Sequence, residues 1–316
     1  MLDIIGIGST FVDYFFDADN KILNKYNLRP EDDFLFSEKN ISPIDIFENL
    51  SLLSKSPGGI SVNTIVVLGA LGVNVSYCGV IGKDKDGNYF FNNLKRVDKH
   101  HLIKSGTMGR CACLLSHNRR YRTFLSQVNP RDNDFFKNVD YNYLNNSKVI
   151  HVSSFLLNPE KNLKNLNKIF KKIKNPLISF SPSIAYVNLG LKAILPLLEK
   201  THVIFLNEQE IKKLINKNPK DASKYLLTYG VKIVACTMGA KGVLITSGKE
   251  QFFSPSPKVK KVIDTTGAGD AFAAGFLYGL IKNKSLKWSA KFANKIASKS
   301  VSDFGLNWLR NINVKD

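Results

Sequence analysis

Short apolar runs that alternate with helix-length segments are the feature of this sequence that most restricts its fold. The runs are rich in Val, Ile, Leu and Phe. This alternation predicts parallel strands joined by helices that cover both faces of one sheet. We therefore expect an α/β fold with a central, mostly parallel sheet. The predicted strands are Ile4 to Ile7, Val75 to Val80, Val149 to Val152, Leu177 to Phe180, Val203 to Leu206 and Ile233 to Cys236.

Two regions depart from this alternation. Residues from about Thr10 to Asn40 are aromatic and acidic, and residues from about Arg110 to Ser126 alternate like the strands of a hairpin. Alternation with a period of two is typical of half-buried strands. We expect a single domain over 1–316, with a small β lid contributed by about 10–48 and 106–129.

Composition restricts the class of protein. The hydrophobic fraction of 44% and the charged fraction of 22% are typical of globular chains. Four cysteines form neither a disulfide framework nor paired zinc spacing, which favours thiols in a reducing compartment. The first residues lack the basic region of a signal peptide, and the apolar stretch from Thr64 to Gly82 is interrupted by glycines and polar residues. We expect a cytoplasmic protein without a membrane span.

The net charge of +19 attracts anionic partners, of which nucleotide phosphate and nucleic acid are the two candidates. The lysines are spread over helical patterns such as Lys161 to Lys174, where an apolar stripe predicts an amphipathic helix with a solvated basic face. No nucleic-acid-binding motif accompanies the charge. We therefore expect no nucleic-acid partner.

The segment Val262 to Gly279, VIDTTGAGDAFAAGFLYG, predicts a site that binds phosphate and accepts a proton. It is expected to run from a short strand through a Gly-rich turn into a helix that begins near Asp270. Gly267 and Gly269 permit a tight turn, and the free N–H groups at the start of the helix attract phosphate oxygens. Asp270 beside them can accept the proton of an attacking hydroxyl group without needing a raised pKa. A turn and a helix cap alone also account for these residues.

The same segment, at Asp264 to Asp270, resembles the C-terminal signature of the ribokinase or PfkB carbohydrate kinase family. A second family signature is matched by Gly58 to Thr64, and it continues through Leu68 to Gly72 and Gly79 to Asp84. The similarity extends nearly from end to end. It implies a ribokinase-like fold and transfer of the γ-phosphate of ATP to a hydroxymethyl group of a sugar or nucleoside, with Mg²⁺ and K⁺ as the associated cations.

The resemblance also implies residue roles around the Gly-rich turn. Asp270 is the base, and the main chain of Gly267, Ala268 and Gly269 stabilises the transferring phosphate. Asp264 and Thr266 are similar to positions that hold a monovalent cation.

Asn207 and Glu210 match the family's NxxE motif, which is associated with the Mg²⁺ and phosphate network, mostly through water. Positions three apart share one face of a helix, so the two side chains can act on one hydrated ion. A helix start with a capping box predicts the same residues. Both interpretations stay open.

The turn that includes Thr237, Gly239 and Gly242 resembles the nucleotide-binding turn of the family, although a hairpin before the next strand accounts for it as well. Asn294 aligns with a family position near the adenine.

On the acceptor side, Asp13 matches a family aspartate that hydrogen-bonds sugar hydroxyls, and Gly58, Gly59 and Asn63 complete the expected pocket. A carboxylate and an amide suit vicinal hydroxyls because they accept and donate several hydrogen bonds. The alternative for Asp13 is an ordinary turn residue.

The segments Asp17 to Asn40 and Gly109 to Cys113 look more like the adenosine kinase branch than like ribokinase. Lid aromatics could stack on a base, or could simply hold the lid together. We expect a ribonucleoside such as adenosine as the acceptor, with ribose, fructose or fructose phosphate as the alternative. Family members often pair through the sheet of the lid, which allows for a homodimer.

Other classes fit less well. The third glycine of a dinucleotide-binding fingerprint is replaced by Phe11, and Gly82-Lys83 lacks the upstream glycine of a P-loop. A ligand-binding or regulatory protein with this fold and no activity is the remaining alternative, and the presence of Asp270 argues against it.

Overall fold

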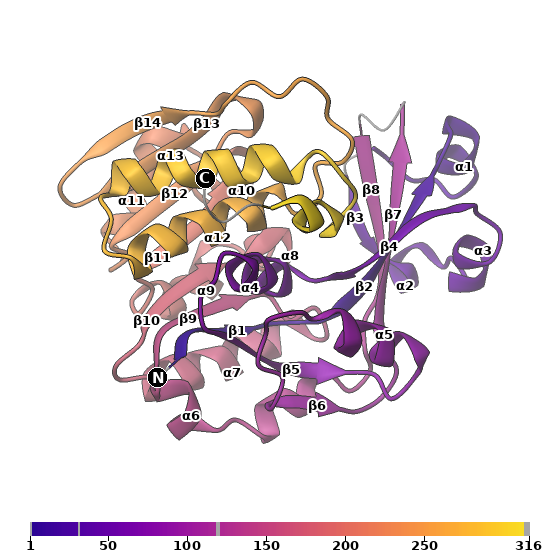
Figure 1. The fold of residues 1–316 in the computed structure, drawn as a ribbon, viewed down its shortest axis with the longest axis horizontal. Coiled ribbons are helices and arrows are strands. Elements are labelled where there is room, and N and C mark those ends of the chain that lie inside the picture. The colour runs from indigo at the N-terminus through magenta and orange to yellow at the C-terminus, as the bar shows by residue number, and fades with distance from the viewer. Residues whose placement is uncertain (1, 31, 118–120, 313–316) are drawn as a thin grey trace.

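A large sheet of nine strands organises the computed structural model, which describes residues 2–30, 32–117 and 121–312. The strand order is β14-β13-β12-β11-β10-β9-β1-β5-β6, parallel except for the antiparallel pairings of β12 with β13 and of β13 with β14 (Figure 1). All six predicted strands are confirmed, and the α/β fold is ribokinase-like. The bounds are β1 Leu2–Ile7, β5 Val75–Ile81, β6 Leu102–Lys104, β9 Ser147–Ser153, β10 Leu177–Ser181, β11 Val203–Asn207, β12 Ile233–Thr237, β13 Gly242–Ser247 and β14 Gln251–Pro255.

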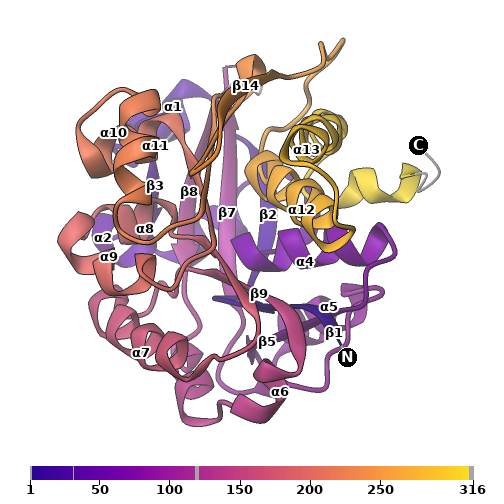
Figure 2. The ribbon, with the colours of Figure 1, turned by 90° about the vertical axis from the view of Figure 1, so that its left-hand side faces the viewer.

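Helices cover both faces of this sheet, as Figure 2 shows. Helices α4, α12 and α13 pack on one face through one apolar core, and α7 to α11 pack on the other through a second core. The amphipathic pattern expected over Lys161 to Lys174 forms α7, which ends at Lys172. The bounds are α4 Ile60–Ala70, α5 Lys85–Asn93, η1 Asp132–Lys137, α6 Tyr141–Asn145, α7 Pro159–Lys172, α8 Ser183–Val187, α9 Leu191–Leu198, α10 Glu208–Ile215, α11 Pro219–Leu227, η2 Gly239–Lys241, α12 Ala268–Ile281, α13 Leu286–Ser300 and η3 Asn307–Asn311.

A second sheet of five strands, in the order β3-β8-β7-β2-β4, forms the lid (Figure 1). The two predicted lid segments contribute four of its strands. The fifth, β4, begins after residue 48 and so extends the lid beyond its predicted limit. Residues 118–120, in the predicted hairpin turn, lie outside the described residues. The bounds are β2 Phe11–Asp17, β3 Asp33–Leu35, β4 Leu52–Gly58, β7 Gly109–Ser116 and β8 Tyr121–Gln127.

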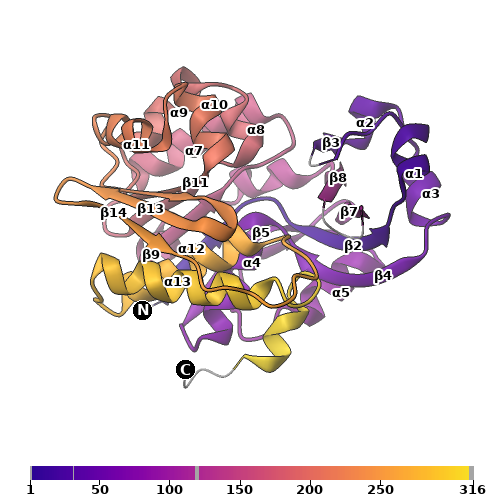
Figure 3. The ribbon, with the colours of Figure 1, turned by 90° about the horizontal axis from the view of Figure 1, so that it is seen from above.

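The two faces of the lid sheet have different surroundings. Helices α1 (Asn20–Lys25), α2 (Phe36–Lys39) and α3 (Pro43–Phe47) cover the face that points away from the large sheet (Figure 3). A second apolar cluster, which includes Phe11, Phe15, Cys111, Cys113 and Leu115, lines the opposite face. Because the outer face is covered, a homodimer through the lid would have to use the edges or the helices, and it stays a prediction.

One buried carboxylate joins the lid to the body. Asp86, on α5, accepts hydrogen bonds from Tyr14 at 2.6 Å, Lys55 at 2.5 Å and Arg110 at 2.6 Å. These three side chains come from β2, β4 and β7 of the lid. We call this group the Asp86 tether.

Close packing of α12 against α13 fixes the helix that carries the Gly-rich turn. A Cβ atom on Gly275 would lie 2.7 Å from the Cα atom of Ala293, so only glycine allows this approach.

The strand predicted before the Gly-rich turn is not formed. The chain at Val262 is irregular, and the side chain of Val262 is 53% exposed. Among the residues described, no helix is long and apolar enough to cross a membrane.

Candidate active site

Asp270 lies in the first turn of α12, as the sequence predicts. Its Oδ2 atom accepts a hydrogen bond of 2.9 Å from the Nδ2 atom of Asn63 on α4. The hydroxyl group of Thr64 donates to the main-chain oxygen of Asp270 at 3.3 Å. The two family signatures therefore meet in space, and Asn63 positions the carboxylate of Asp270.

The environment of Asp270 changes its acidity. Burial raises the pKa of the carboxyl group to about 7. The hydrogen bond from Asn63 opposes this rise, the carboxylate of Glu210 adds to it, and the positive charge of Arg122 on the lid lowers the pKa. The sequence did not require this raised pKa, which results from tertiary burial and brings the group near the pKa that is best for a general base at neutral pH.

The first turn of α12 leaves two N–H groups available. The N–H group of Ala268 donates to the carbonyl of Thr265 at 3.2 Å. No residue in the described ranges accepts from Gly269 or Asp270, as is normal at the start of a helix. Gly267 has a φ of 74°, in the left-handed region that favours glycine. This geometry fits an anion hole, with Ala268 contributing less than the resemblance implies.

Asp13 lies within β2 and is 7% exposed, so it is not the turn residue considered as the alternative. Burial, together with the negative charges of Asp264 and Asp270, raises the pKa of its carboxyl group to about 8. A Cβ atom on Gly58 would collide with the Asp13 carboxyl group. Gly59, with a φ of 112°, begins α4 directly beside Ser9. Of the predicted acceptor residues, Gly58 therefore lies directly against the Asp13 carboxyl group, whereas Asn63 contacts Asp270.

Asp264 and Thr266 lie side by side in the loop before α12. Asp264 is 2% exposed, and its two oxygens accept from the N–H groups of Thr266 at 2.9 Å and Gly305 at 3.2 Å. The Oγ1 atom of Thr266 is buried and has no hydrogen-bond partner among the residues that the structure describes. An orphaned buried hydroxyl beside a carboxylate fits a cation that takes oxygen ligands. The residues thus fit the monovalent-cation role, which stays a prediction.

Asn207 and Glu210 form the capping box that was one of the two predictions for them. The Asn207 N–H group donates to Oε2 of Glu210 and the Glu210 N–H group donates to Oδ1 of Asn207, both at 2.8 Å. Burial raises the pKa of Glu210. No described residue donates to the second oxygen, Oε1, of Glu210, so the cap leaves a carboxylate oxygen for a hydrated Mg²⁺. The Mg²⁺ role stays a prediction, and the two interpretations are compatible.

The predicted nucleotide-binding residues lie at neighbouring places. Thr237 pairs with Asn207 at the ends of β12 and β11, and the turn through Gly239 and Gly242 joins β12 to β13. Asn294 is 3% exposed, and its Nδ2 atom donates to the main-chain oxygens of β14 residues Ser254 at 2.9 Å and Pro255 at 3.2 Å. Its amide therefore holds α13 against the sheet, and contact with adenine stays a prediction.

Sequence reasoning missed Arg122, whose charge acts on Asp270, and Asp132, which binds Ser9 next to Gly59. Arg122 pairs with Leu115, which places it in register with the residues that line the inner face of the lid. Asp132 is 1% exposed, accepts a short hydrogen bond from Ser9, and has its pKa raised by burial to about 7. Strand alternation could have placed Arg122. No local pattern indicates Asp132.

A surface hollow of about 250 Å³ lies elsewhere, between α7 and α9, lined by residues such as Leu163, Asn167 and Pro196. Helices α7 and α9 lie on the opposite side of the large sheet from α4 and α12 (Figure 2). The hollow shares no residue with the site, and we assign it no role in the chemistry.

Comparison with known proteins agrees with this geometry. Residues 37–309 match the model of the pfkB family of carbohydrate kinases, and the chain belongs to that family. Relatives include adenosine kinase from Saccharomyces cerevisiae, 29% identical over 96% of this chain and 95% of that protein. Ribokinase from Bacillus subtilis is also 29% identical, over 79% and 82% of the two chains. This chain is thus a carbohydrate or nucleoside kinase.

A solved structure shows the same fold. Adenosine kinase from Anopheles gambiae, in complex with P1,P4-di(adenosine-5) tetraphosphate, superimposes with a TM-score of 0.85 at 19% identity, over 98% of each chain.

Proposed function

We propose that the protein transfers the γ-phosphate of ATP to a hydroxymethyl group of a ribonucleoside such as adenosine, with Asp270 as the base. The observation that carries this proposal is the carboxylate of Asp270, held by Asn63 at 2.9 Å beside unused N–H groups of α12. Asp270 lies close enough to Asp13, on the lid, for its negative charge to raise the pKa of Asp13. One acceptor molecule can then contact both carboxylates.

The geometry supports a simple division of work. Asp13 and the residues around it bind ring hydroxyls, which orients the hydroxymethyl group towards Asp270. Asp270 accepts the proton of that hydroxyl as its oxygen attacks the γ-phosphorus, and the bond to the β,γ-bridging oxygen breaks to release ADP. The N–H groups of Gly269 and Asp270 stabilise negative charge on the transferring phosphoryl group.

Two cations complete the proposal. Glu210 and Asn207 would hold a hydrated Mg²⁺, and Asp264 with Thr266 would hold K⁺. When bound, these ions neutralise phosphate charge and support the first turn of α12.

Two features favour a nucleoside over a free sugar. The inner face of the lid is aromatic, with Phe11 and Phe15 buried and Phe124 partly buried, which suits a base next to Asp13. The similarity to yeast adenosine kinase also extends over more of the chain than the similarity to ribokinase. A free sugar or sugar phosphate is the second candidate, since the polar residues around Asp13 suit either.

The first prediction tests the base. We expect Asp270→Ala to lower kcat by about 10²- to 10⁴-fold, because it removes the group that accepts the proton. The measurement is ADP release from ATP with a panel of nucleosides, pentoses, hexoses and hexose phosphates. The acceptor with the highest kcat/KM identifies the substrate class.

Asp221→Ala is the matched control, because Asp221 lies in the first turn of α11 and its Oδ2 atom also accepts from an asparagine, Asn218, at 2.7 Å. We expect this variant to keep wild-type turnover. Equal turnover in Asp270→Ala and wild type would refute the assignment of the base. No turnover of any acceptor by the wild type would favour the non-catalytic alternative.

A further inference from the structure

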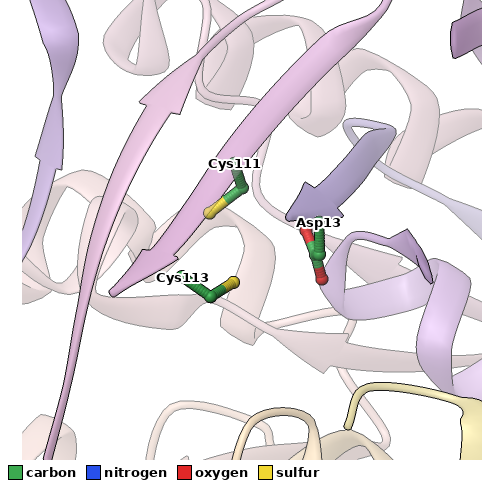
Figure 4. A group of neighbouring side chains, drawn as sticks. All are labelled: Asp13, Cys111 and Cys113. Carbon is green, nitrogen blue, oxygen red and sulfur yellow. The ribbon is translucent and has the colours of Figure 1, made fainter. Parts of the chain in front are cut away.

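The inner face of the lid brings two thiols and a carboxylate together. Asp13 comes from β2, and Cys111 and Cys113 come from the neighbouring strand β7 (Figure 4). One ligand atom from each residue lies within 4.8 Å of the other two, and all three side chains are buried. This is the one group of three such side chains found in the described part of the chain. We call it the thiol–carboxylate cluster.

Strand register explains the convergence. Asp13 pairs with Cys111 across β2 and β7, and Cys113 lies two residues further along β7. Side chains two apart on a strand lie on the same face, so both sulfur atoms are directed to the side of the sheet that carries Asp13. The cluster is built into the strands themselves, which hold ligand atoms more rigidly than loops do.

The carboxylate of Asp13 is available to a ligand. Asp13 is only 7% exposed, and no described residue donates a hydrogen bond to its carboxylate. A buried carboxylate without a hydrogen bond is costly. The nearby carboxylates of Asp264 and Asp270 add negative charge, which favours a cation at this place.

The geometry points to a binding site for a thiophilic divalent cation, Zn²⁺ or a metal of similar chemistry, formed by Asp13, Cys111 and Cys113. Two sulfurs and one oxygen are a ligand set that zinc accepts, and three protein ligands leave the fourth position to water. Mg²⁺ prefers oxygen ligands and would not compete well here. On binding, the two thiols lose their protons to solvent.

Occupation of this site has a consequence that rests on the proposed function. Asp13 cannot hold a metal and bind the acceptor hydroxyls at the same time. Zn²⁺ therefore acts as an inhibitor that competes with the acceptor.

The second prediction uses Co²⁺ as a spectroscopic probe on the whole protein without substrate. We expect one Co²⁺ per chain with a thiolate-to-cobalt absorption band in the near ultraviolet, and displacement of that band by Zn²⁺. Cys111→Ser and Cys113→Ser each weaken Co²⁺ affinity by at least about 100-fold. Cys236→Ser is the matched control, because Cys236 is a buried free thiol in the large sheet, and it keeps the wild-type band.

Binding of Co²⁺ without a thiolate band in the wild type, or equal affinity in Cys111→Ser, Cys113→Ser and wild type, overturns the site. The wild-type spectrum decides the question even if a variant fails to fold.

A separate measurement tests the competition. In the absence of ATP, the best acceptor from the panel is titrated into the protein with and without Zn²⁺. An apparent Kd that increases with Zn²⁺ supports a shared Asp13. An unchanged acceptor Kd with Zn²⁺ bound overturns the shared site and the acceptor role of Asp13, while leaving the metal site intact.

Discussion

At the scale of single residues, Asp270 shows what a local sequence pattern can predict and what it cannot. Its place at the start of a helix follows from turn glycines and helix chemistry, which are encoded within a few neighbours. Its partner Asn63 lies 207 residues earlier, so the contact is a property of the folded chain. The raised pKa of Asp270 and the burial of Asp13 likewise depend on tertiary packing, which the sequence motifs do not report.

The third prediction concerns pH. The base form of Asp270 is the deprotonated form, and its pKa is raised from the ordinary value of 3.8 to about 7. We expect kcat/KM to fall below pH 7, by about tenfold for each further pH unit, because kcat/KM reports the groups of the free enzyme. The measurement is initial rate at low acceptor concentration from pH 5 to pH 9.

Asn63→Leu provides the contrast for this profile. The hydrogen bond from Asn63 lowers the pKa of Asp270, so its loss should move the inflection to higher pH. A profile that is flat between pH 5 and pH 8 would show that Asp270 does not titrate there.

At the scale of elements, the apolar runs predicted the parallel strands because a strand buried on both faces must be apolar along its length. Strand β4 was missed because its residues, LLSKSPG, have no such run and lie half-buried in the lid. The prediction of a strand at Val262 was wrong, because that segment pairs with no strand in the described part of the chain.

The fourth prediction tests that packing. Gly275→Ala places a Cβ atom 2.7 Å from the Cα atom of Ala293, so α12 and α13 must separate. We expect a loss of about 1–3 kcal/mol in the free energy of unfolding, measured by urea denaturation. Gly248→Ala is the control, because a Cβ atom there meets no atom within 4 Å, and its effect should be small. Equal stability of the two variants would contradict the close approach of the helices.

At the scale of the whole molecule, the lid and the body are separate sheets that share one site. Asp13 belongs to the lid and Asp270 to the body, so their separation depends on how the lid is held. The Asp86 tether connects three lid strands to α5. Neither the tether nor the strand order could be predicted, because both depend on pairings between residues far apart in the chain.

The fifth prediction tests the tether. Asp86 is largely buried, and although burial raises its pKa, the hydrogen bonds from Lys55 and Tyr14 and the charge of Arg110 lower it below the ordinary value. We expect Asp86→Asn to lose about 2 kcal/mol of unfolding free energy at pH 7, less than for a fully buried pair because Arg110 is partly solvated.

The lowered pKa of Asp86 also predicts how the stability difference between wild type and Asp86→Asn changes with pH. A carboxyl group with a lowered pKa in the folded state stabilises the protein above its unfolded pKa, about 3.9, and loses that contribution as the pH falls below it. The difference between wild type and Asp86→Asn should therefore shrink below pH 4. Asp32→Asn removes an exposed ion pair with Arg29 and should cost under about 0.5 kcal/mol. A similar cost for both variants would argue against the tether.

The position of β1 in the large sheet has a consequence for how the chain folds as it is made. Strand β1 ends at residue 7, yet it lies between β5 and β9, and β9 begins only at residue 147. At ribosomal rates of about 5–20 residues per second, roughly 7 to 28 seconds pass between the synthesis of this apolar strand and that of its second neighbour. During that time the nascent chain exposes an unpaired strand edge. We expect cellular yield to depend on chaperones that shield the first half of the chain during synthesis.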